Sequence, residues 1–367
     1  MFGKADDKRK ESVFNMAEIE ILKSIIEINT IADKENEKMI EFLEKFLKKN
    51  GFSTKRVGEG PYCLVAHIGE NPTLGFICHT DTVSDSPEWT QNPFTLTETK
   101  DKLYGLGVCD MKGGIAALLY AVTQFHFKKK DSLALYFTFD EEVGFRGIHT
   151  LVQNQIKFPD KIILTEPTDL IPVIASKGCL EFKITVVGKA THSSTPSLGE
   201  NAIDKARELL IELEEFYRSI QEEKNEVFEI PYATYNLSTI QGGDSINKVP
   251  DTCTFTFDFR TISVVQNKKI VEKMKEIEKR NDITIEILNE VKPAINENEE
   301  MINYLENITQ KKKRGLNYTT EASFLTNGSM AILGPGPVTA HMKDEYITKE
   351  SYQETIEAYQ SIIKQYL

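Results

Sequence analysis

The stretch from Leu74 to Tyr120 constrains the fold most, because ionisable residues follow directly on a run with the pattern of a buried strand. The apolar run that ends at Cys78 leads straight into His79 and Asp81. Parallel α/β sheets present ligand-binding side chains in this way, at the carboxyl ends of their strands. His79 and Asp81 are two positions apart and so point the same way along a strand. The carboxylate of Asp81 is then placed to accept the imidazole N–H that faces away from a metal.

A second ionisable residue in this stretch stands at the start of a predicted helix. Asp110 follows a Gly-x-Gly turn that ends at Gly107, and it precedes Gly113-Gly114 and an apolar run. This pattern places Asp110 at the N-terminal end of a predicted helix. Together with His79 and Asp81 it predicts half of a metal site.

Other predicted strands end in metal-ligand residue types as well. The strand-like run Leu133 to Phe139 leads into three acidic residues, the run Lys161 to Leu164 is followed by a glutamate, and a Gly-Pro-rich loop delivers a histidine. A lone histidine is more often a satisfied core or surface residue, but parallel strands converge at one edge of their sheet and share a cleft there. The predicted cluster consists of His79, Asp81, Asp110, Glu141, Glu142, Glu166 and His341.

The chemistry of this cluster requires a cation. Several carboxylates and two imidazoles do not pack together in a cleft without positive charge. Nitrogen and oxygen ligands without a thiolate suit one or two Zn²⁺ ions, with Mn²⁺ or Co²⁺ as substitutes. If Glu142 is a ligand, Glu141 points elsewhere and can take a proton from a water molecule at the site.

Composition narrows the class of protein. A chain of 367 residues is long for one domain, and a net charge of −12 argues against nucleic acid or an anionic membrane as partner. No apolar run approaches the length of a membrane span, and Met1 to Ser12 lacks the apolar core of a secretory signal. Five scattered cysteines suit reduced, buried thiols better than disulfides. We expect a cytoplasmic protein.

The order of predicted elements indicates an α/β fold of two domains. Up to residue 177, strands alternate with helices, which predicts a mostly parallel sheet covered on both faces. Residues 178–290 read as βαββαβ, the order of a ferredoxin-like α+β domain with a four-stranded antiparallel sheet and two helices. From 291 to 367 the chain is predicted to rejoin the first domain. The expected domains are therefore 1–177 with 291–367, and an insertion at 178–290.

At this point the motifs carry a resemblance that extends over nearly the whole chain beyond the first dozen residues. These motifs are His79-Thr80-Asp81-Thr82-Val83, Asp110-Met111-Lys112-Gly113, Asp140-Glu141-Glu142, Glu166-Pro167-Thr168, Gly188-x-x-x-His192 and Ala340-His341. They resemble the zinc amidohydrolase family of acetylornithine deacetylase, succinyl-diaminopimelate desuccinylase, aminoacylase and glutamate carboxypeptidase.

The resemblance implies a zinc-exopeptidase-like catalytic domain with two metal ions. One ion would be held by His79, Asp110 and Glu166, and the other by Asp110, Glu142 and His341. Glu141 would be the general base and acid, Asp81 would support His79, and the Asp110–Met111 peptide bond would be cis.

The inserted domain would be the lid through which the family forms homodimers. His192 would reach the active site of the partner subunit and stabilise the developing oxyanion. Asn247 and Arg260 would hold the substrate carboxylate, a task for which the arginine fork is well shaped. From the residues alone, His192 is more readily interpreted as a loop or capping residue, and Arg260 as an ordinary exposed charge at a strand end, so both assignments depend mainly on the resemblance.

Further motifs are most similar to the acetylornithine deacetylase branch, with the acetylcitrulline deacetylases also similar. The implied reaction is hydrolysis of an N-acyl amide, from N2-acetyl-L-ornithine to L-ornithine and acetate in arginine biosynthesis. Deacetylation of acetylcitrulline and desuccinylation of N-succinyl amino acids remain open. So do two other classes, a dipeptidase or aminopeptidase and a non-catalytic dimeric binding protein, although the complete ligand set argues against the last.

Overall fold

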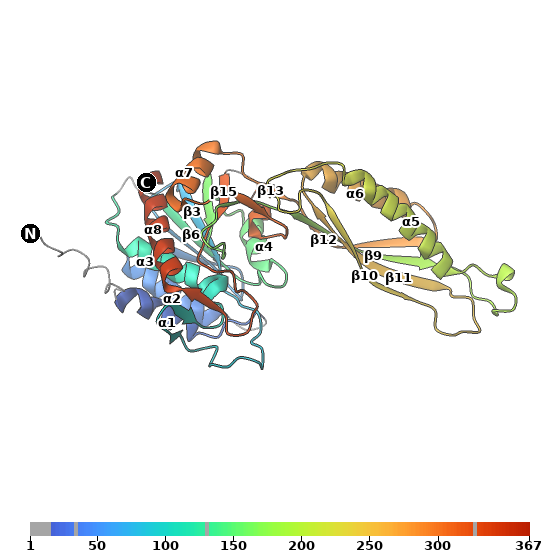
Figure 1. Ribbon diagram of the computed structural model, residues 1–367, viewed down its shortest axis with the longest axis horizontal. Coiled ribbons are helices and arrows are strands. Elements are labelled where there is room, and N and C mark those ends of the chain that lie inside the picture. Colours follow the sequence, from blue (N-terminus) through green and yellow to red (C-terminus); the bar gives the residue numbers. More distant parts are fainter. Residues whose placement is uncertain (1–15, 33–35, 129–131, 326–328) are drawn as a thin grey trace, which may run out of the picture. The chain divides into compact units, whose positions relative to one another are not determined.

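The computed structural model describes residues 16–32, 36–128, 132–325 and 329–367, so the expectation about Met1 to Ser12 lies outside the described residues. The described chain divides into two compact units (Figure 1). Unit 1 comprises Met1–Pro172, Glu297–Lys312 and Asn327–Leu367, and unit 2 comprises Val173–Asn296 and Lys313–Thr326.

Unit 1 is built on a mainly parallel sheet, as the sequence predicts. In spatial order its strands are β1 (Ser53–Val57), β2 (Cys63–Ile68), β6 (Leu133–Thr138), β3 (Leu74–His79), β7 (Lys161–Leu164) and β15 (Ser329–Ile332). The last four are parallel to one another, whereas β1 and β2 add an antiparallel edge. The parallel strands bring their carboxyl ends to one edge of the sheet.

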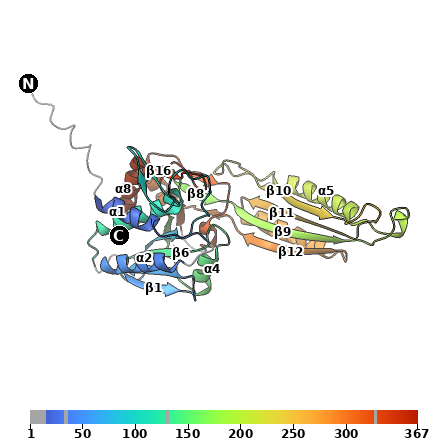
Figure 2. The same ribbon diagram turned by 90° about the horizontal axis from the view of Figure 1, so that it is seen from below.

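Helices cover both faces of this sheet. Every residue of β3 and β6 is buried, and successive side chains of a strand point to opposite faces, so neither face is open to solvent. The helices of unit 1 are α1 (Met16–Ile26), α2 (Glu37–Lys49), α3 (Gly113–Thr123), α4 (Arg146–Gln153), α7 (Glu299–Thr309) and α8 (Lys349–Tyr366). Helix α3 is buried along nearly its whole length, which explains why its sequence is apolar all round. Figure 2 shows helices α1, α2, α4 and α8 around the strands of this unit.

A small sheet and a short helical segment stand beside the main sheet of unit 1. The small sheet has the order β16 (Tyr346–Thr348), β5 (Lys102–Tyr104) and β4 (Thr97–Glu98), and the helical segment η1 spans Val108–Lys112. Strands of two or three residues show no periodicity, so the sequence gives no signal for them. Nevertheless, β5 precedes Asp110 and pairs with β16, which follows His341, so the small sheet joins these two segments.

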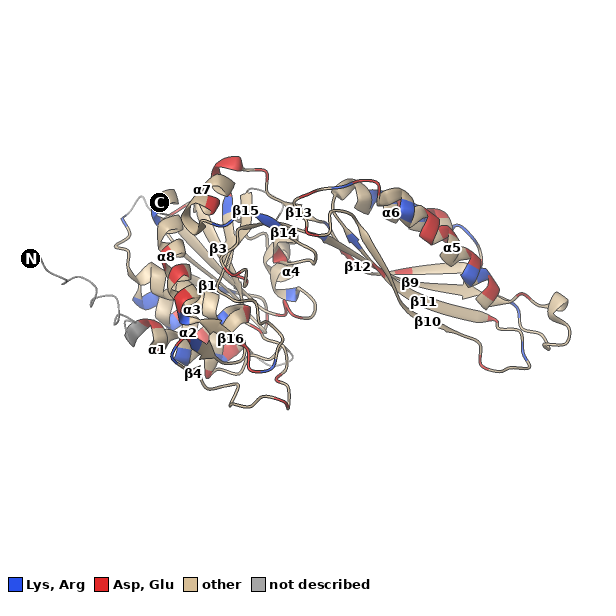
Figure 3. Cartoon of the chain, viewed as in Figure 1, with Lys and Arg blue, Asp and Glu red and all other residues tan. Residues whose placement is uncertain are grey.

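The core of unit 2 is the predicted βαββαβ arrangement. Its antiparallel sheet has the order β10 (Thr234–Gly242), β11 (Thr252–Thr261), β9 (Gly178–Val187) and β12 (Ile283–Val291). Helices α5 (Ala202–Ile220) and α6 (Val264–Glu278) lie on one face (Figure 1). Alternate residues of β11, from Cys253 to Phe259, are buried in the core that these helices share. Both signs of charge are interspersed along the two helices (Figure 3).

Unit 2 extends beyond the predicted insertion. Outside residues 178–290 it contains β8 (Val173–Ser176), β13 (Ala294–Ile295), β14 (Arg314–Leu316) and the short helix η3 (Glu321–Phe324). The short helix η2 (Pro196–Leu198) lies within the predicted insertion. Strand β8 pairs with β13 and β14, so residues 313–326 group with unit 2 rather than with the rest of the C-terminal segment. The boundaries 1–177, 178–290 and 291–367 stay a prediction.

Two expectations from composition can be compared with the described residues. All five cysteines are buried and none is paired in a disulfide, in agreement with the expected thiols. No helix in the described part of the chain is long and apolar enough to cross a membrane.

Candidate metal centre

The predicted residues of unit 1 meet at the carboxyl edge of its sheet. His79 ends β3, Glu141 and Glu142 follow β6, Glu166 follows β7, and His341 lies in the loop after β15. Each is delivered by a buried strand whose apolar sequence fixes where the backbone leaves the sheet.

Asp110 lies between the two histidines and faces both. Its Oδ1 is 2.9 Å from Nε2 of His79, and its Oδ2 is 3.7 Å from Nε2 of His341. The same nitrogen of His79 lies 3.6 Å from Oε1 of Glu166, and that of His341 lies 2.9 Å from Oε2 of Glu142. One carboxylate with an oxygen toward each histidine is the arrangement that a residue shared by two metal ions needs.

Glu141 belongs to the same cluster. Ligand atoms of His79, Glu141 and Glu166 lie within 4.8 Å of one another, as do those of His79, Asp110 and Glu142. Distance alone therefore does not separate Glu141 from the ligands, and its role as the base stays a prediction.

Burial and neighbouring charges raise the pKa values of three residues in this cluster. Burial, together with the negative charge of Asp110, raises the pKa of Glu166 to about 8. The hydrogen bond to Glu142 raises the pKa of His341 to about 9. Burial lowers the pKa of His79, but the charge of Glu166 and the hydrogen bond to Asp110 outweigh it and raise this pKa overall. Without a metal ion, the residues of this cluster therefore hold protons more tightly, and a bound cation would release those protons.

The oxygens of two glutamates indicate that a metal fits here. Among the described residues, Oε1 of Glu142 and Oε1 of Glu166 are buried and have no hydrogen-bond partner. A buried acceptor without a donor costs about 1–3 kcal/mol, and metal ions held at the cluster would satisfy these oxygens. The mixed histidine and carboxylate donors suit Zn²⁺, Co²⁺ or Mn²⁺.

Asp81 supports the cluster in a different way from the one that the sequence predicts. Nδ1 of His79 lies 3.0 Å from the backbone oxygen of Asp81 and 3.6 Å from its carboxylate, so the carbonyl is the nearer acceptor. This contact places the proton of the neutral ring on Nδ1 and leaves the Nε2 lone pair facing the cluster. The carboxylate instead accepts the backbone N–H groups of Glu141 and Glu142, each at 3.2 Å. Asp81 therefore ties the end of β3 to the end of β6.

A second carboxylate shapes the turn that carries the two glutamates. Asp140 is buried, and its carboxylate accepts two hydrogen bonds from the guanidinium of Arg146, at 2.8 and 2.9 Å. Its backbone oxygen also accepts the N–H of Gly144 at 3.0 Å. From the sequence, Asp140 is only the first residue of an acidic run, and its structural role was not predicted. The arginine at the start of α4 could have indicated this role, because a guanidinium suits a bidentate pair with a carboxylate.

Three of the predicted site residues, His192, Asn247 and Arg260, lie in unit 2. His192 and Asn247 lie on adjacent segments, because the N–H of Ser193 donates to the carbonyl of Asn247 at 3.0 Å and His192 forms a β-bridge with Lys248. Nδ1 of His192 accepts the backbone N–H of Ser194 at 3.1 Å. The neutral ring therefore carries its proton on Nε2, where an exposed side chain can donate it.

Arg260 lies at the other end of β11 from Asn247. Arg260 pairs with Cys179 at the start of β9, whereas Thr252 pairs with Val187 at its end. The strand from Thr252 to Arg260 spans roughly 26 Å at about 3.3 Å per residue. The guanidinium is not an isolated charge, since it donates to the carboxylate of Asp258 at 2.7 and 3.1 Å. Asn247 and Arg260 of one chain therefore cannot hold the same small carboxylate.

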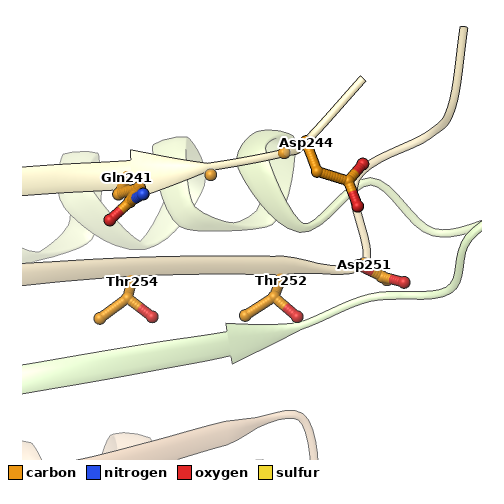
Figure 4. Close-up of a pocket in the computed structure, with 7 residues that line it drawn as sticks. Gln241, Asp244, Asp251, Thr252 and Thr254 are labelled. Carbon is orange, nitrogen blue, oxygen red and sulfur yellow. The ribbon is translucent and has the colours of Figure 1, made fainter. Parts of the chain in front are cut away.

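The segment of Asn247 borders a hollow in unit 2. This cavity of about 300 Å³ is lined by Gln241, Gly242, Gly243, Asp244, Asp251, Thr252 and Thr254 (Figure 4). The ammonium group of Lys248 lies 3.0 Å from Asp244 and 3.2 Å from Asp251 and offsets one of their two negative charges. None of the predicted site residues lines the cavity.

Comparison with known proteins agrees with this geometry. The model of peptidase family M20/M25/M40 matches residues 75–365. A protein named acetylornithine deacetylase from Buchnera aphidicola (strain APS) is 36% identical over 363 residues, which are 92% of this chain and 94% of that protein. One of the same name from Photorhabdus laumondii is 35% identical over 353 residues, covering 90% and 92% of the two chains.

Solved structures show the same fold. A putative aminohydrolase from methicillin-resistant Staphylococcus aureus matches with a TM-score of 0.77 and 16% identity, covering 95% of this chain and 96% of that one. A tripeptidase from Staphylococcus aureus matches with a TM-score of 0.75 and 19% identity, covering 95% and 98%. With the family match, the relatives above 30% identity and the carboxylate–histidine cluster in agreement, this chain belongs to peptidase family M20/M25/M40 and is a metal-dependent hydrolase.

Proposed function

We propose that this protein hydrolyses the N-acyl amide of N2-acetyl-L-ornithine, releasing L-ornithine and acetate in arginine biosynthesis. The reaction rests on the metal cluster, above all on Asp110 with one oxygen toward each histidine. The substrate rests on relatives named acetylornithine deacetylase, which are 32–36% identical over at least 90% of this chain.

The metal ions of the proposal are two Zn²⁺, with Co²⁺ or Mn²⁺ as substitutes. We assign His79, Asp110 and Glu166 to one ion, and Asp110, Glu142 and His341 to the other. When bound, such ions polarise a carbonyl oxygen and lower the pKa of water.

Glu141 is the proposed proton carrier. It takes the proton of the attacking water and returns it to the leaving amine, so that ornithine departs as a neutral amine rather than as an amide anion. Its backbone N–H, and that of Glu142, are held by the carboxylate of Asp81. Asp81 thereby positions both the base and a ligand.

We further propose that the active enzyme is a homodimer with composite sites. Asn247 and Arg260 lie at opposite ends of β11 and meet one substrate carboxylate only if different subunits supply them. His192 lies beside Asn247 and enters the site of the partner subunit together with it. Its Nε2–H then donates to the oxyanion that forms at the acyl carbonyl oxygen.

We also place the enzyme in the cytoplasm, because its five buried thiols suit a reducing compartment.

A substrate panel tests the proposed function. The zinc-loaded protein is given Nα-acetylornithine, Nα-acetylcitrulline, N-succinylornithine, N-succinyl-diaminopimelate and two unblocked dipeptides, and amine release is measured. We expect kcat/KM for acetylornithine to exceed that for the other acyl compounds by about 10- to 200-fold, the range that a few pocket contacts supply.

Each other result points to a different function. Preference for acetylcitrulline or a succinyl compound would keep the chemistry and change the substrate. Cleavage of dipeptides alone would make the protein a peptidase. Silence on the whole panel, with metal content verified on the same sample, would favour a binding protein.

A further inference from the structure

A buried glutamate outside the predicted cluster holds the turn that ends in Asp110. Glu345 is 2% exposed. Its carboxylate accepts three backbone N–H groups, from Gly107 and Cys109 at 2.7 Å each and from Asp110 at 3.0 Å. A buried carboxylate that receives three charge-assisted hydrogen bonds fixes the path of the backbone that donates them.

The same glutamate lies in the loop that carries His341, and Thr339 and Tyr346 close this loop. Near its base, the hydroxyl of Thr339 accepts the N–H of Tyr346 at 3.0 Å and donates to the carbonyl of Tyr346 at 2.6 Å. His341 within this loop has a φ of 63°, in the left-handed region that side chains rarely adopt without support. The backbone of Glu345 adds a further link, since its carbonyl accepts the N–H of Gly105 at 3.2 Å.

We propose that Glu345 is a positioning residue of the metal centre, which sets Asp110 against His341 by joining the two segments that carry them. The inference rests on the proposed metal ligands. It follows from the connections described above: Glu345 binds the backbone of Asp110 directly and lies four residues from His341 in a loop that is closed on itself. The ion assigned to Asp110, Glu142 and His341 therefore depends on it most.

Substitutions at Glu345 are expected to act in graded order. In Glu345→Gln, the amide oxygen can keep the N–H groups of Cys109 and Asp110, while the amide NH₂ faces the N–H of Gly107 and loses that bond. In Glu345→Ala all three are lost. The matched control is Asp344→Asn in the same loop, because the carboxylate of Asp344 accepts the N–H and hydroxyl of Thr90, at 2.8 and 2.9 Å, on a segment without a metal ligand.

The experiment measures Zn²⁺ affinity without substrate. The wild-type protein and the three variants are stripped of metal and titrated with Zn²⁺ against a colour-forming chelator. Loss of support behind a metal ligand lowers affinity by about 10- to 100-fold. In Glu345→Gln we expect that loss at one site, the one assigned to Asp110, Glu142 and His341. We expect a larger loss in Glu345→Ala and wild-type affinity in Asp344→Asn. The visible spectrum of Co²⁺ in Glu345→Gln should change as well.

A purely structural role gives a different result. If Glu345 only caps the start of η1, the Tm of the metal-free variant falls while both Zn²⁺ affinities stay at the wild-type value, and the inference is overturned. Equal losses of affinity in Glu345→Gln and Asp344→Asn also overturn it. Should Glu345→Ala fail to fold, Glu345→Gln decides. Because no substrate is present, the result is independent of whether acetylornithine is hydrolysed.

Discussion

Glu141→Gln is expected to lower kcat on acetylornithine by about 100- to 10,000-fold, the contribution of a positioned general acid–base group. Glutamine has the same shape as glutamate but neither takes nor returns a proton at neutral pH. The variant should keep its full content of Zn²⁺, because Glu141 is not assigned to either ion. The measurement is kcat together with metal content on one preparation.

The neighbouring residue supplies the control for this prediction. Glu142→Gln changes the same chemical group one position along the chain, and its Oε2 lies 2.9 Å from His341. We expect this variant to lose metal as well as turnover. Because ligand atoms of Glu141, His79 and Glu166 also lie within 4.8 Å of one another, loss of metal in Glu141→Gln would make Glu141 a ligand instead. Retained activity within tenfold, with metal bound, would contradict its role as proton carrier.

His192→Ala is expected to lower kcat by about 100- to 1,000-fold, as removal of one oxyanion donor does elsewhere. The side chain lies in unit 2, outside the carboxylate–histidine cluster, so metal content should not change. Equal loss of metal and activity would place His192 among the ligands. Unchanged kcat would remove it from the mechanism.

Mixing two inactive variants tests whether His192 acts in the partner subunit. In a heterodimer of Glu141→Gln and His192→Ala, one of the two sites receives an intact Glu141 and an intact His192. Random exchange of subunits should then restore about a quarter of the active sites. A mixture of Glu141→Gln with Glu142→Gln is the control and should stay inactive, because each defect lies in the site of its own subunit. Failure to restore activity in the first mixture would contradict the composite site.

The parts of the structure that sequence reasoning predicts are those set by continuous patterns. The apolar run before His79 predicts β3, and the alternation from Thr252 to Thr261 predicts β11 with its buried phenylalanines. Because parallel strands end at one edge, the residues that follow them could be grouped before any distance was known. The mainly parallel sheet and the βαββαβ order are confirmed for the same reason.

What sequence reasoning misses depends on backbone contacts between distant segments. Glu345 binds N–H groups more than 230 positions away, and no local pattern marks a carboxylate for that task. The preference of His79 for the carbonyl of Asp81 over its carboxylate follows from how the chain turns after β3. The pairing of Arg260 with Asp258 had a signal, since residues two apart on a strand share a face.

The most direct test of the account is reconstitution of the stripped protein. Metal is removed with a chelator, Zn²⁺ is added back in steps, and release of ornithine from Nα-acetylornithine is followed at each step. We predict no turnover by the stripped protein and a rise that levels off at about two equivalents of Zn²⁺ per chain, as in two-metal sites. Equal turnover before and after reloading, with removal of the metal verified, would contradict a metal centre formed by Asp110 and its neighbours.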